Sequence, residues 1–505
     1  MTLIQPLKKR RGIIPVPVTS TSSQPQSSSK PKLSIKKVLI ANRGEIAVRV
    51  ARACRELGVR SVAIYSEADR YALHVKKADE SHCLGSDPLQ GYLSPHQIVN
   101  LAVETGCDAL HPGYGFLSEN AELAEICAQR GVKFIGPSAD VIRQMGDKTE
   151  ARNSAKRASV PVTPGSEGNL RDLEHAVEVA AGIGYPVMLK ATSGGGGRGI
   201  RRCNDEKDLR SNYQRVISEA TKAFGRAEVF LEKCIVDPRH IEVQVLADAH
   251  GGVVHLYERD CSIQRRNQKL IELAPSPQLT NEQRHYVGEL AVKVAREVGY
   301  ENAGTVEFLL DHDGSFYFME MNTRVQVEHT ITEQITGIDI VKTQIRIAAG
   351  EPLPFLQADI SYRGFAAQFR INAEDPKNGF LPSFGRISRY YSPGGPGVRT
   401  DAAIYTGYTI PPYYDSMCAK LIVWNLTWED LLERAERALE DMQIYGIRTT
   451  IPYYREILRH PQFRAGDFNT GFVEAHPELI NYSIKRRPES LAAALAAAVA
   501  AQAGM

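Results

Sequence analysis

The sequence predicts a multidomain protein that combines α/β and α+β architecture, and three observations support this prediction. The chain has 505 residues, more than a single hydrophobic core normally accommodates. Residues 38–65 show the strand–helix–strand pattern of a parallel sheet. Residues 305–322 form two apolar, alternating runs around Asp313-Gly314, a strong signal for an antiparallel hairpin.

Composition argues against several classes of function. With 43% hydrophobic and 24% charged residues, the chain has the composition of an ordinary globular protein. A formal net charge of +2 argues against nucleic acid as the main partner. No apolar run approaches the roughly 18 residues that span a bilayer, so we expect no membrane association. The 8 Cys include no CxxC pair, which predicts reduced thiols and a cytoplasmic protein.

The two ends of the chain differ from the rest. Residues 1–34 carry a basic cluster and then run through Ser, Thr, Pro and Gln. They predict a disordered leader or, alternatively, a basic docking arm. Residues 481–505 end in an Ala-rich helical pattern. Because Ala favours helix but supplies little core, we expect this helix to pack on a neighbour, either within the chain or on another subunit.

The first structural unit begins at residue 38. A buried-type strand leads into the turn at residues 42–45, a helical pattern over residues 46–57 and a second strand at residues 61–65. The turn either binds an anion at the helix start or serves packing alone. The loop at residues 111–115 follows another strand end, the position at which open α/β sheets hold ligands.

A run of glycines lies between two predicted strands farther along. The first strand ends at Lys190, and residues 194–197 are all Gly. Four consecutive glycines cost backbone entropy that a plain hairpin does not require, but they let main-chain N–H groups approach phosphate oxygens. The spacing is not that of a P-loop. We interpret the run as a phosphate lid that closes over a ligand; the alternative is a flexible hairpin tip.

The predicted hairpin sets the register of two acidic strands. A two-residue turn at Asp313-Gly314 pairs His312 with Ser315. A four-residue loop gives the same register.

Counting back from that turn sets Glu307 directly opposite Glu320. Like charges at this position are destabilising, and a divalent cation such as Mg²⁺ or Mn²⁺ removes the penalty. Asn322 follows on the same face as a third oxygen ligand, and Arg324 and Glu328 offer an anion fork and a candidate base. The alternative is a solvated hairpin face with scattered charge.

Two other segments carry charge in strand-like surroundings. Residues 258–269 read ERDCSIQRRNQK; Gln, Asn and Lys between arginines at a strand end favour an anion site over a solvated face. Residues 364–374 read as a strand that carries Arg370. Taken alone, that arginine is more typical of a surface ion pair than of a catalytic group.

Six motifs in order resemble biotin carboxylase, an ATP-grasp ligase. The likeness runs from about residue 36 to about residue 477. In detail the sequence is most similar to the A subunit, the biotin carboxylase subunit, of two-subunit pyruvate carboxylases. Three features support this likeness: the RRNQK variant, the segment GFVEAHPELINYSIKRRPE and the Ala-rich tail. The motifs are NRGEIA at 42–47, HPGYGFLSEN at 111–120, KATSGGGGRGI at 190–200, ERDCSIQRRNQK at 258–269, EMNTRVQVEHTITE at 320–333 and RINAEDP at 370–376.

The resemblance implies a three-domain ATP-grasp fold. An N-terminal Rossmann-like domain would span residues 35–150, a mobile ATP lid residues 151–235 and a C-terminal ATP-grasp/biotin carboxylase domain residues 236–480. It also implies the reaction. MgATP and bicarbonate form carboxyphosphate, and its breakdown delivers CO₂ to the ureido nitrogen of biotin.

Residue roles follow by motif match. Glu328 would deprotonate bicarbonate and Arg370 would stabilise the biotin enolate. Bicarbonate would contact Lys269, Arg324, Gln326 and Val327; two metal ions would bind Glu307, Glu320 and Asn322; ATP would contact Lys148, Lys190, Gly195, Gly196, Gly197, Glu232, Lys233, Ile235, His240 and Gln264.

The charges implied by this assignment suit the chemistry. Lys269 and Arg324 beside Glu328 are expected to lower its pKa, so that the base is ionised at neutral pH. Asn267 stands where the wider family usually has His, which puts a ribose or phosphate contact in doubt.

The sequence also predicts partners. It contains no Met-Lys-Met biotinylation site and nothing that forms a second catalytic barrel. We therefore expect a biotinyl carrier and a carboxyltransferase on another polypeptide, and family likeness implies a homodimer of this chain. Three alternatives remain: the biotin carboxylase subunit of acetyl-CoA carboxylase or another acyl-CoA carboxylase, a different ATP-grasp ligase that forms an acyl phosphate, and a non-enzymatic nucleotide sensor.

Overall fold

The structure of the chain is a computed structural model that describes residues 33–191, 199–224 and 228–483, together with residues 495, 496, 499, 500 and 502. Residues 1–32 of the predicted leader, together with Gly195, Gly196 and Gly197, therefore lie outside the described residues. So does most of the Ala-rich segment, whose packing stays a prediction.

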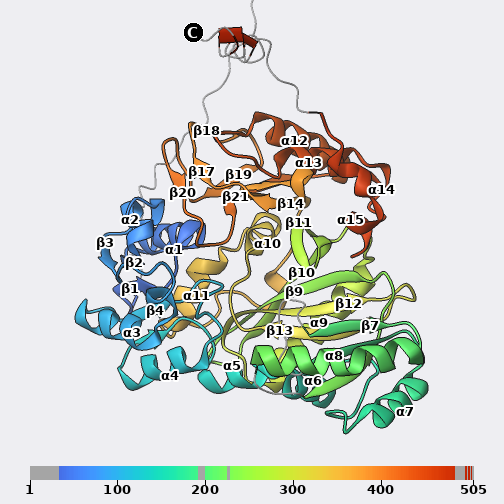
Figure 1. Cartoon of the computed structure of the whole chain (residues 1–505). Coiled ribbons are helices and arrows are strands. Elements are labelled where there is room, and N and C mark those ends of the chain that lie inside the picture. The colour runs from blue at the N-terminus through green and yellow to red at the C-terminus, as the bar shows by residue number, and fades with distance from the viewer. Residues whose placement is uncertain are drawn as a thin grey trace, which may run out of the picture.

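The N-terminal region forms the predicted parallel sheet (Figure 1, blue). Its five strands lie in the order β3-β2-β1-β4-β5, and every pairing is parallel. Helix α1 ends where Gly58 adopts φ +71°, the left-handed C-cap conformation that glycine favours. The elements are β1 (Lys37–Ile40), α1 (Gly44–Leu57), β2 (Arg60–Tyr65), α2 (Leu73–Lys77), β3 (Glu80–Cys83), α3 (Pro95–Glu104), β4 (Ala109–His111), α4 (Ala121–Gln129) and β5 (Lys133–Phe134).

The loops that follow β1 and β4 lie together at the carboxyl edge of this sheet. Asn42 Nδ2 donates to the carbonyl oxygens of Pro112 and Tyr114, both at 2.8 Å. A Cβ at Gly113 would meet the Asn42 side chain at 2.9 Å, so this close approach requires glycine. These contacts favour the packing interpretation of the turn at residues 42–45.

A small antiparallel sheet forms a second unit, shown in green at the lower right of Figure 1. Its strands lie in the order β7-β6-β8, and two helices pack on it around a separate apolar core. Its elements are α7 (Leu173–Ile183), β6 (Val187–Ala191), β7 (Ile200–Cys203), α8 (Glu206–Phe224) and β8 (Val229–Lys233). Two helices precede it, α5 (Ala139–Gly146) and α6 (Lys148–Arg157), and their apolar side chains pack in the core of the large sheet described below.

An eight-stranded antiparallel sheet forms the largest unit. Its order is β13-β12-β9-β10-β11-β14-β21-β19. Its strands are β9 (Arg239–Ala247), β10 (Val253–Arg265), β11 (Gln268–Ala274), β12 (Asn302–Leu310), β13 (Phe316–Asn322), β14 (Phe365–Asn372), β19 (Val398–Ala402) and β21 (Met417–Asn425). Its helices are α9 (Asn281–Glu297), α10 (His329–Thr336), α11 (Ile340–Ala348), α12 (Trp428–Asp441), α13 (Ile451–Arg459), α14 (Pro461–Arg464) and α15 (Phe472–Ala475).

Smaller elements complete this unit, and one apolar core ties it to the first. Residues of α1 share that core with residues of α11, so the parallel sheet is fixed against the large one. The remaining strands pair as β15 (Glu374–Asp375) with β16 (Leu381–Pro382), β17 (Gly385–Arg386) with β20 (Thr409–Ile410), and β18 (Arg389–Tyr391) with β22 (Gln443–Tyr445). No helix in the described part of the chain has both the length and the apolar character that crossing a membrane requires.

The hairpin confirms the opposition of Glu307 and Glu320, but the predicted turn is wrong. The Asp311 amide bonds the Ser315 carbonyl at 2.9 Å, so the turn is one residue out of the predicted register. A register shift between Phe318 and Glu320 then restores the pairing, because an extra residue in one strand shifts all later pairs.

The polar run at residues 258–269 is also placed differently from its predicted position after a strand. Strand β10 continues through it to Arg265, and β11 begins at Gln268. The run is thus part of the buried sheet, not a loop beyond it.

Candidate active site

Charged side chains form a row across four adjacent strands of the large sheet. Glu320 of β13 pairs with Glu307 of β12, which pairs with Glu242 of β9, which pairs with Arg259 of β10. Because residues in register share a face of the sheet, the three carboxylates and the guanidinium project to the same side. Arg259 is fully buried and bonds Glu242.

Lys269 of β11 joins three buried carboxylates, and we call this group the Lys269 cluster: Lys269, Glu242, Glu307 and Glu328. The Lys269 ammonium bonds Glu328 at 2.7 Å, Glu307 at 3.0 Å and Glu242. The side chains of Glu242 and Glu328 are 0% exposed. The three donors of the ammonium thus each have a carboxylate within reach.

A second cation fixes the other side of Glu328. Arg370 of β14 donates through Nη2 to Glu328 at 3.1 Å and through Nε to Glu272 of β11. Gln368 donates to the second Glu272 oxygen at 3.0 Å. Arg370, whose side chain is 15% exposed, is therefore a bridge between two buried carboxylates, not the surface ion pair that its isolated sequence context indicates.

These cations keep Glu328 ionised. Burial alone would raise the pKa of the Glu328 carboxyl, but the positive charges of Lys269, Arg370 and Arg259 outweigh burial and hold the pKa well below 4.5. The predicted direction is confirmed. The second cation on Glu328 is Arg370, whereas the sequence analysis named Arg324. The same carboxylates hold the pKa of Lys269 well above 10.5, against the effect of burial.

The two opposed glutamates of the hairpin have different surroundings. Glu307 is held by Lys269 and accepts hydrogen bonds from His240 at 2.8 Å, Asn322 at 2.9 Å and Gln326 at 3.1 Å, and its pKa is lowered despite burial. Burial and then the charge of Glu307 raise the pKa of Glu320.

This difference fits a divalent cation. A metal ion bound by Glu320 and Glu307 would relieve the repulsion between the two carboxylates, which the charges of Lys148 and Lys269 offset only in part, and carboxylate oxygens are the donors that Mg²⁺ and Mn²⁺ prefer. The Asn322 oxygen, in contrast, accepts from Arg324 Nη2 at 3.1 Å.

Arg324 lies at the edge of the site. Its Nε pairs with Glu119 of the N-terminal unit at 2.9 Å, and its Nη1 donates to Gln326 at 2.9 Å. The Val327 carbonyl accepts from the fully buried Lys420 at 2.9 Å. Lys420 also pairs with Glu45 at 3.0 Å, so the segment before Glu328 is anchored to both large units.

A separate group lies in the small sheet. Lys190 of β6 pairs with Glu232 of β8, and Arg152 of α6 pairs with the second Glu232 oxygen at 2.7 Å. We call these three residues the Glu232 group. Burial would raise the pKa of Glu232, but the two cations lower it.

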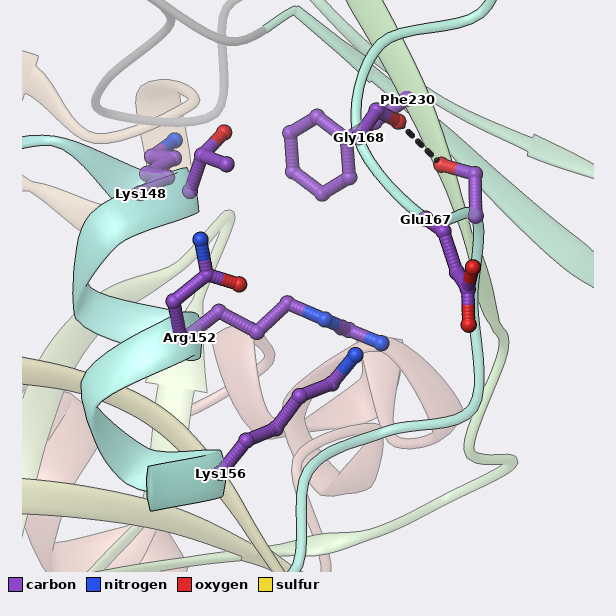
Figure 2. A pocket seen from close by; sticks show the side chains of 9 residues that line it. Lys148, Arg152, Lys156, Glu167, Gly168 and Phe230 are labelled. Atoms are coloured by element: carbon purple, nitrogen blue, oxygen red, sulfur yellow. Dashed lines mark hydrogen bonds between the residues drawn. The ribbon is translucent and has the colours of Figure 1, made fainter. Parts of the chain in front are cut away.

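A cavity of about 340 Å³ adjoins the Glu232 group. Figure 2 shows Lys148, Arg152 and Lys156 on helix α6, facing Glu167 and Phe230 across it. Burial lowers the pKa of Lys148. A basic helix face opposite a phenyl ring can accommodate an anionic ligand with an aromatic part.

Other predicted ATP residues are placed as follows. Lys233 Nζ donates to the carbonyls of Gly184 at 2.8 Å and Tyr185 at 3.2 Å. Ile235 is half-buried in the segment between β8 and β9. Gln264 is buried and opposite Lys269 in the β10–β11 pairing. His240, predicted near the ribose, contacts Glu307 through Nε2 at 2.8 Å.

Several residues of the site were not predicted. Glu242 alternates with His240 and Gln244 in an otherwise apolar strand, and this polar face was the available signal. Glu272 is the one acid in the apolar run KLIELA, and an acid in such a run was a second available signal. Glu119 lies in the quoted motif at residues 111–120, but nothing in that motif indicates its pairing with Arg324, and Arg152 had no local signal, because both partners are distant in sequence.

Comparisons with known proteins agree with this geometry. Three family profiles match in sequence: biotin carboxylase, N-terminal domain, at residues 34–142; carbamoyl-phosphate synthase L chain, ATP binding domain, at residues 147–356; and biotin carboxylase C-terminal domain, at residues 368–475.

Similar proteins match over most of their length. The chain is 55% identical to the 2-oxoglutarate carboxylase small subunit of Hydrogenobacter thermophilus over 93% of this chain and 100% of that one. It is 54% identical to biotin carboxylase 1 of Bacillus subtilis, over 88% and 99%. It is 51% identical to a pyruvate carboxylase subunit of Methanothermobacter thermautotrophicus, over 89% and 92%.

A solved structure gives the same result. The biotin carboxylase domain dimer of the H. thermophilus 2-oxoglutarate carboxylase, in complex with MgADP, ADP and bicarbonate, superimposes with a TM-score of 0.86 at 56% identity, covering 89% of this chain and 99% of that one. The buried Glu328 carboxylate, its two cations and the matches across all three regions lead to one conclusion: the chain belongs to the biotin carboxylase family of ATP-dependent ligases.

Proposed function

We propose that this chain carboxylates biotin on a separate carrier polypeptide, and that its complex transfers the carboxyl group to a 2-oxo acid, with pyruvate as the first choice. The observation that carries the biotin half-reaction is Glu328, a fully buried carboxylate held in its ionised form between Lys269 and Arg370. A fixed, ionised base beside two cations can take a proton from a bound anion and stabilise the charge that develops.

The residues divide the work as follows. Lys269 and Arg324 hold bicarbonate, and Glu328 accepts its proton. The bicarbonate oxygen then attacks the γ-phosphorus of ATP, which forms carboxyphosphate and releases ADP. Carboxyphosphate breaks down to CO₂ and phosphate, and this phosphate takes the proton of the biotin ureido nitrogen. Arg370 stabilises the resulting enolate, which attacks CO₂. Gln326 and Val327 position the bicarbonate from the loop before Glu328.

ATP lies between the small sheet and the large sheet. Lys148, Lys190 and the glycines Gly195–Gly197 hold its phosphates, Glu232, Lys233 and Ile235 line the adenine end, and His240 and Gln264 lie nearby. Glu307, Glu320 and Asn322 hold Mg²⁺ or Mn²⁺, which supplies positive charge to the phosphates when bound. The two sheets carry the Glu232 group and the Lys269 cluster respectively, which supports this placement.

Phosphate release tests the half-reaction. Release from MgATP and bicarbonate is measured with and without free biotin for the wild type and Glu328→Gln, with the exposed Glu433→Gln as control. We expect biotin to stimulate release, and Glu328→Gln to lower the stimulated rate by about 10²–10⁴-fold, the usual contribution of a general base. Release that is indifferent to biotin would contradict the assignment and indicate another ATP-grasp ligase.

The acceptor requires a second experiment. The relatives from a 2-oxoglutarate carboxylase and a pyruvate carboxylase support a 2-oxo acid, whereas biotin carboxylase relatives from plants and bacteria leave acetyl-CoA as the alternative. The complex co-purified through this chain is supplied with pyruvate, 2-oxoglutarate or acetyl-CoA and labelled bicarbonate. Label fixed only with acetyl-CoA would contradict the 2-oxo acid proposal.

We also propose that this chain forms a homodimer. Support comes from the solved domain dimer of the H. thermophilus relative. Light scattering of the purified chain is expected to give twice the 55.8 kDa chain mass; a monomer at micromolar concentration would contradict it.

A further inference from the structure

A buried histidine outside the active site has an unsatisfied ring nitrogen. His255 lies in β10, four residues before Arg259, and is 2% exposed. Its Nε2 atom has no hydrogen-bond partner among the described residues. Buried polar atoms are nearly always paired with protein, water or an ion, so this nitrogen is available as a ligand atom.

Helix α9 presents two more ligand groups to that nitrogen. His285 and Glu289 are four residues apart, and such pairs share one face of a helix. The ligand atoms of His255, His285 and Glu289 all lie within 4.8 Å of one another. Between them, a Cβ at Gly288 would meet the His255 ring at 2.6 Å, so glycine is what lets the ring lie directly under the helix.

We propose that His255, His285 and Glu289 bind a zinc ion, with water as the fourth ligand, at a site separate from the Glu307–Glu320 pair. Two imidazoles and one carboxylate are a common tetrahedral donor set for Zn²⁺ and a poor one for Mg²⁺, which prefers oxygen. Two ligands one turn apart on a helix are a frequent arrangement at such sites. The ion would clamp α9 onto the strand that carries Arg259.

Binding requires a change of tautomer. The Tyr257 amide donates to His255 Nδ1 at 3.3 Å, which places the proton of the free ring on Nε2. Zinc takes the Nε2 lone pair, so that proton moves to Nδ1, and the long hydrogen bond from Tyr257 is given up. No other atom changes its proton.

A second histidine group meets only part of the same conditions, since His460 Nδ1 is also without a hydrogen-bond partner among the described residues. His460, His476 and Glu478 also lie close together. Both ring nitrogens of His476, however, are already hydrogen-bonded, to Glu478 at 2.9 Å and to Gln462 at 2.6 Å. This group therefore serves as a comparison in the test.

Zinc titration of the metal-free full chain tests the proposal. Cys83, the exposed cysteine of the described residues, is replaced by Ser in every sample. The variants are H285Q and E289Q, both at positions that are not buried. H96Q is the matched control, because His96 and Glu122 form an exposed pair 3.6 Å apart. H476Q tests the second histidine group.

We expect one tightly bound zinc in the parent chain, H96Q and H476Q, and at least tenfold weaker binding in H285Q and E289Q. Co²⁺ should give the visible bands of a tetrahedral site in these three proteins but not in H285Q or E289Q. Zinc should raise the Tm of the parent but not that of H285Q, because a ligand of the folded state stabilises it. Equal zinc binding by the parent and H285Q, or loss in H476Q instead, would overturn the proposal.

Discussion

The Lys269 cluster and the Glu232 group both pair buried carboxylates with cations, but their charge ratios are opposite. In the Lys269 cluster one lysine serves three carboxylates, and the side chains of Glu242 and Glu328 are fully buried. In the Glu232 group one carboxylate serves two cations, and the Lys190 side chain is 23% exposed. The first lies in the eight-stranded sheet and the second in the small one.

This difference indicates two kinds of preorganisation. Charges that are fully desolvated and mutually bonded cannot rearrange cheaply, so the Lys269 cluster is fixed before a substrate arrives. The Glu232 group instead holds surplus positive charge that a phosphate can attract. A site for chemistry and a site for reversible nucleotide binding would need these respective properties.

The largest expected effect is a loss of stability when the Lys269 cluster is broken. Lys269→Gln leaves three buried carboxylates without their shared cation, and we expect it to lower the free energy of unfolding by about 3–5 kcal/mol, the usual cost of breaking a buried pair. Lys190→Gln leaves Arg152 on Glu232 and should cost about 1 kcal/mol or less. Urea unfolding is followed by circular dichroism and by the fluorescence of Trp424 and Trp428, both in the region of the large sheet. Equal losses would contradict the comparison.

The next effect concerns pH. The pKa values of Glu307 and Glu328 are lowered in the folded chain, so each carboxylate stabilises the fold above its unfolded pKa of about 4.5. That stability is lost as pH falls below about 4.5, because the folded state must then take up protons against its own cations.

Glu328→Gln removes one of these contributions. The urea concentration at the unfolding midpoint of Glu328→Gln should therefore fall less steeply with decreasing pH than that of the wild type. Glu433→Gln changes an exposed side chain and should follow the wild type. Parallel acid profiles for wild type and Glu328→Gln would show that the cluster does not depress the Glu328 pKa.

The sequence predicted the parallel sheet, the hairpin and the opposition of Glu307 and Glu320, but not every step toward them. The turn was assigned one residue out of register, and a bulge near Met319 restored the pairing. No local signal marks that bulge. The polar residues at the even-numbered positions of β9 marked Glu242. Its pairing with Arg259 could not be inferred, because the position of Arg259 depends on contacts between segments distant in sequence, such as its bond to Thr332, 73 residues away.

A third prediction separates the two hairpin glutamates. Glu320→Gln removes a like charge opposite Glu307, so the metal-free protein should gain about 0.2–1 kcal/mol of stability, the range for directly opposed cross-strand pairs. Its Mg²⁺ affinity should fall by about tenfold or more, since even outer partners change metal affinity by about 10–100-fold. Glu307→Gln should lower both the stability and the Mg²⁺ affinity, because the Glu307 carboxylate already bonds His240 and Lys269. Urea titration and Mg²⁺-dependent phosphate release measure the two quantities; a Glu320→Gln chain that is less stable would contradict the metal assignment.

The smallest expected effect sharpens the description of the Glu232 group. Arg152→Gln leaves Lys190 as the remaining cation on Glu232, so this carboxylate should hold Lys190 more tightly and release it less readily to a phosphate. A change of about 0.5–1 kcal/mol, typical of partly exposed pairs, corresponds to a KM for ATP raised about 2–5-fold with kcat nearly unchanged. Lys156→Gln is the matched control, because Lys156 is exposed on the same helix and lines the same cavity. If both variants raise KM equally, the cavity attracts ATP through its net charge, and the ion pair between Glu232 and Lys190 has no part in nucleotide binding.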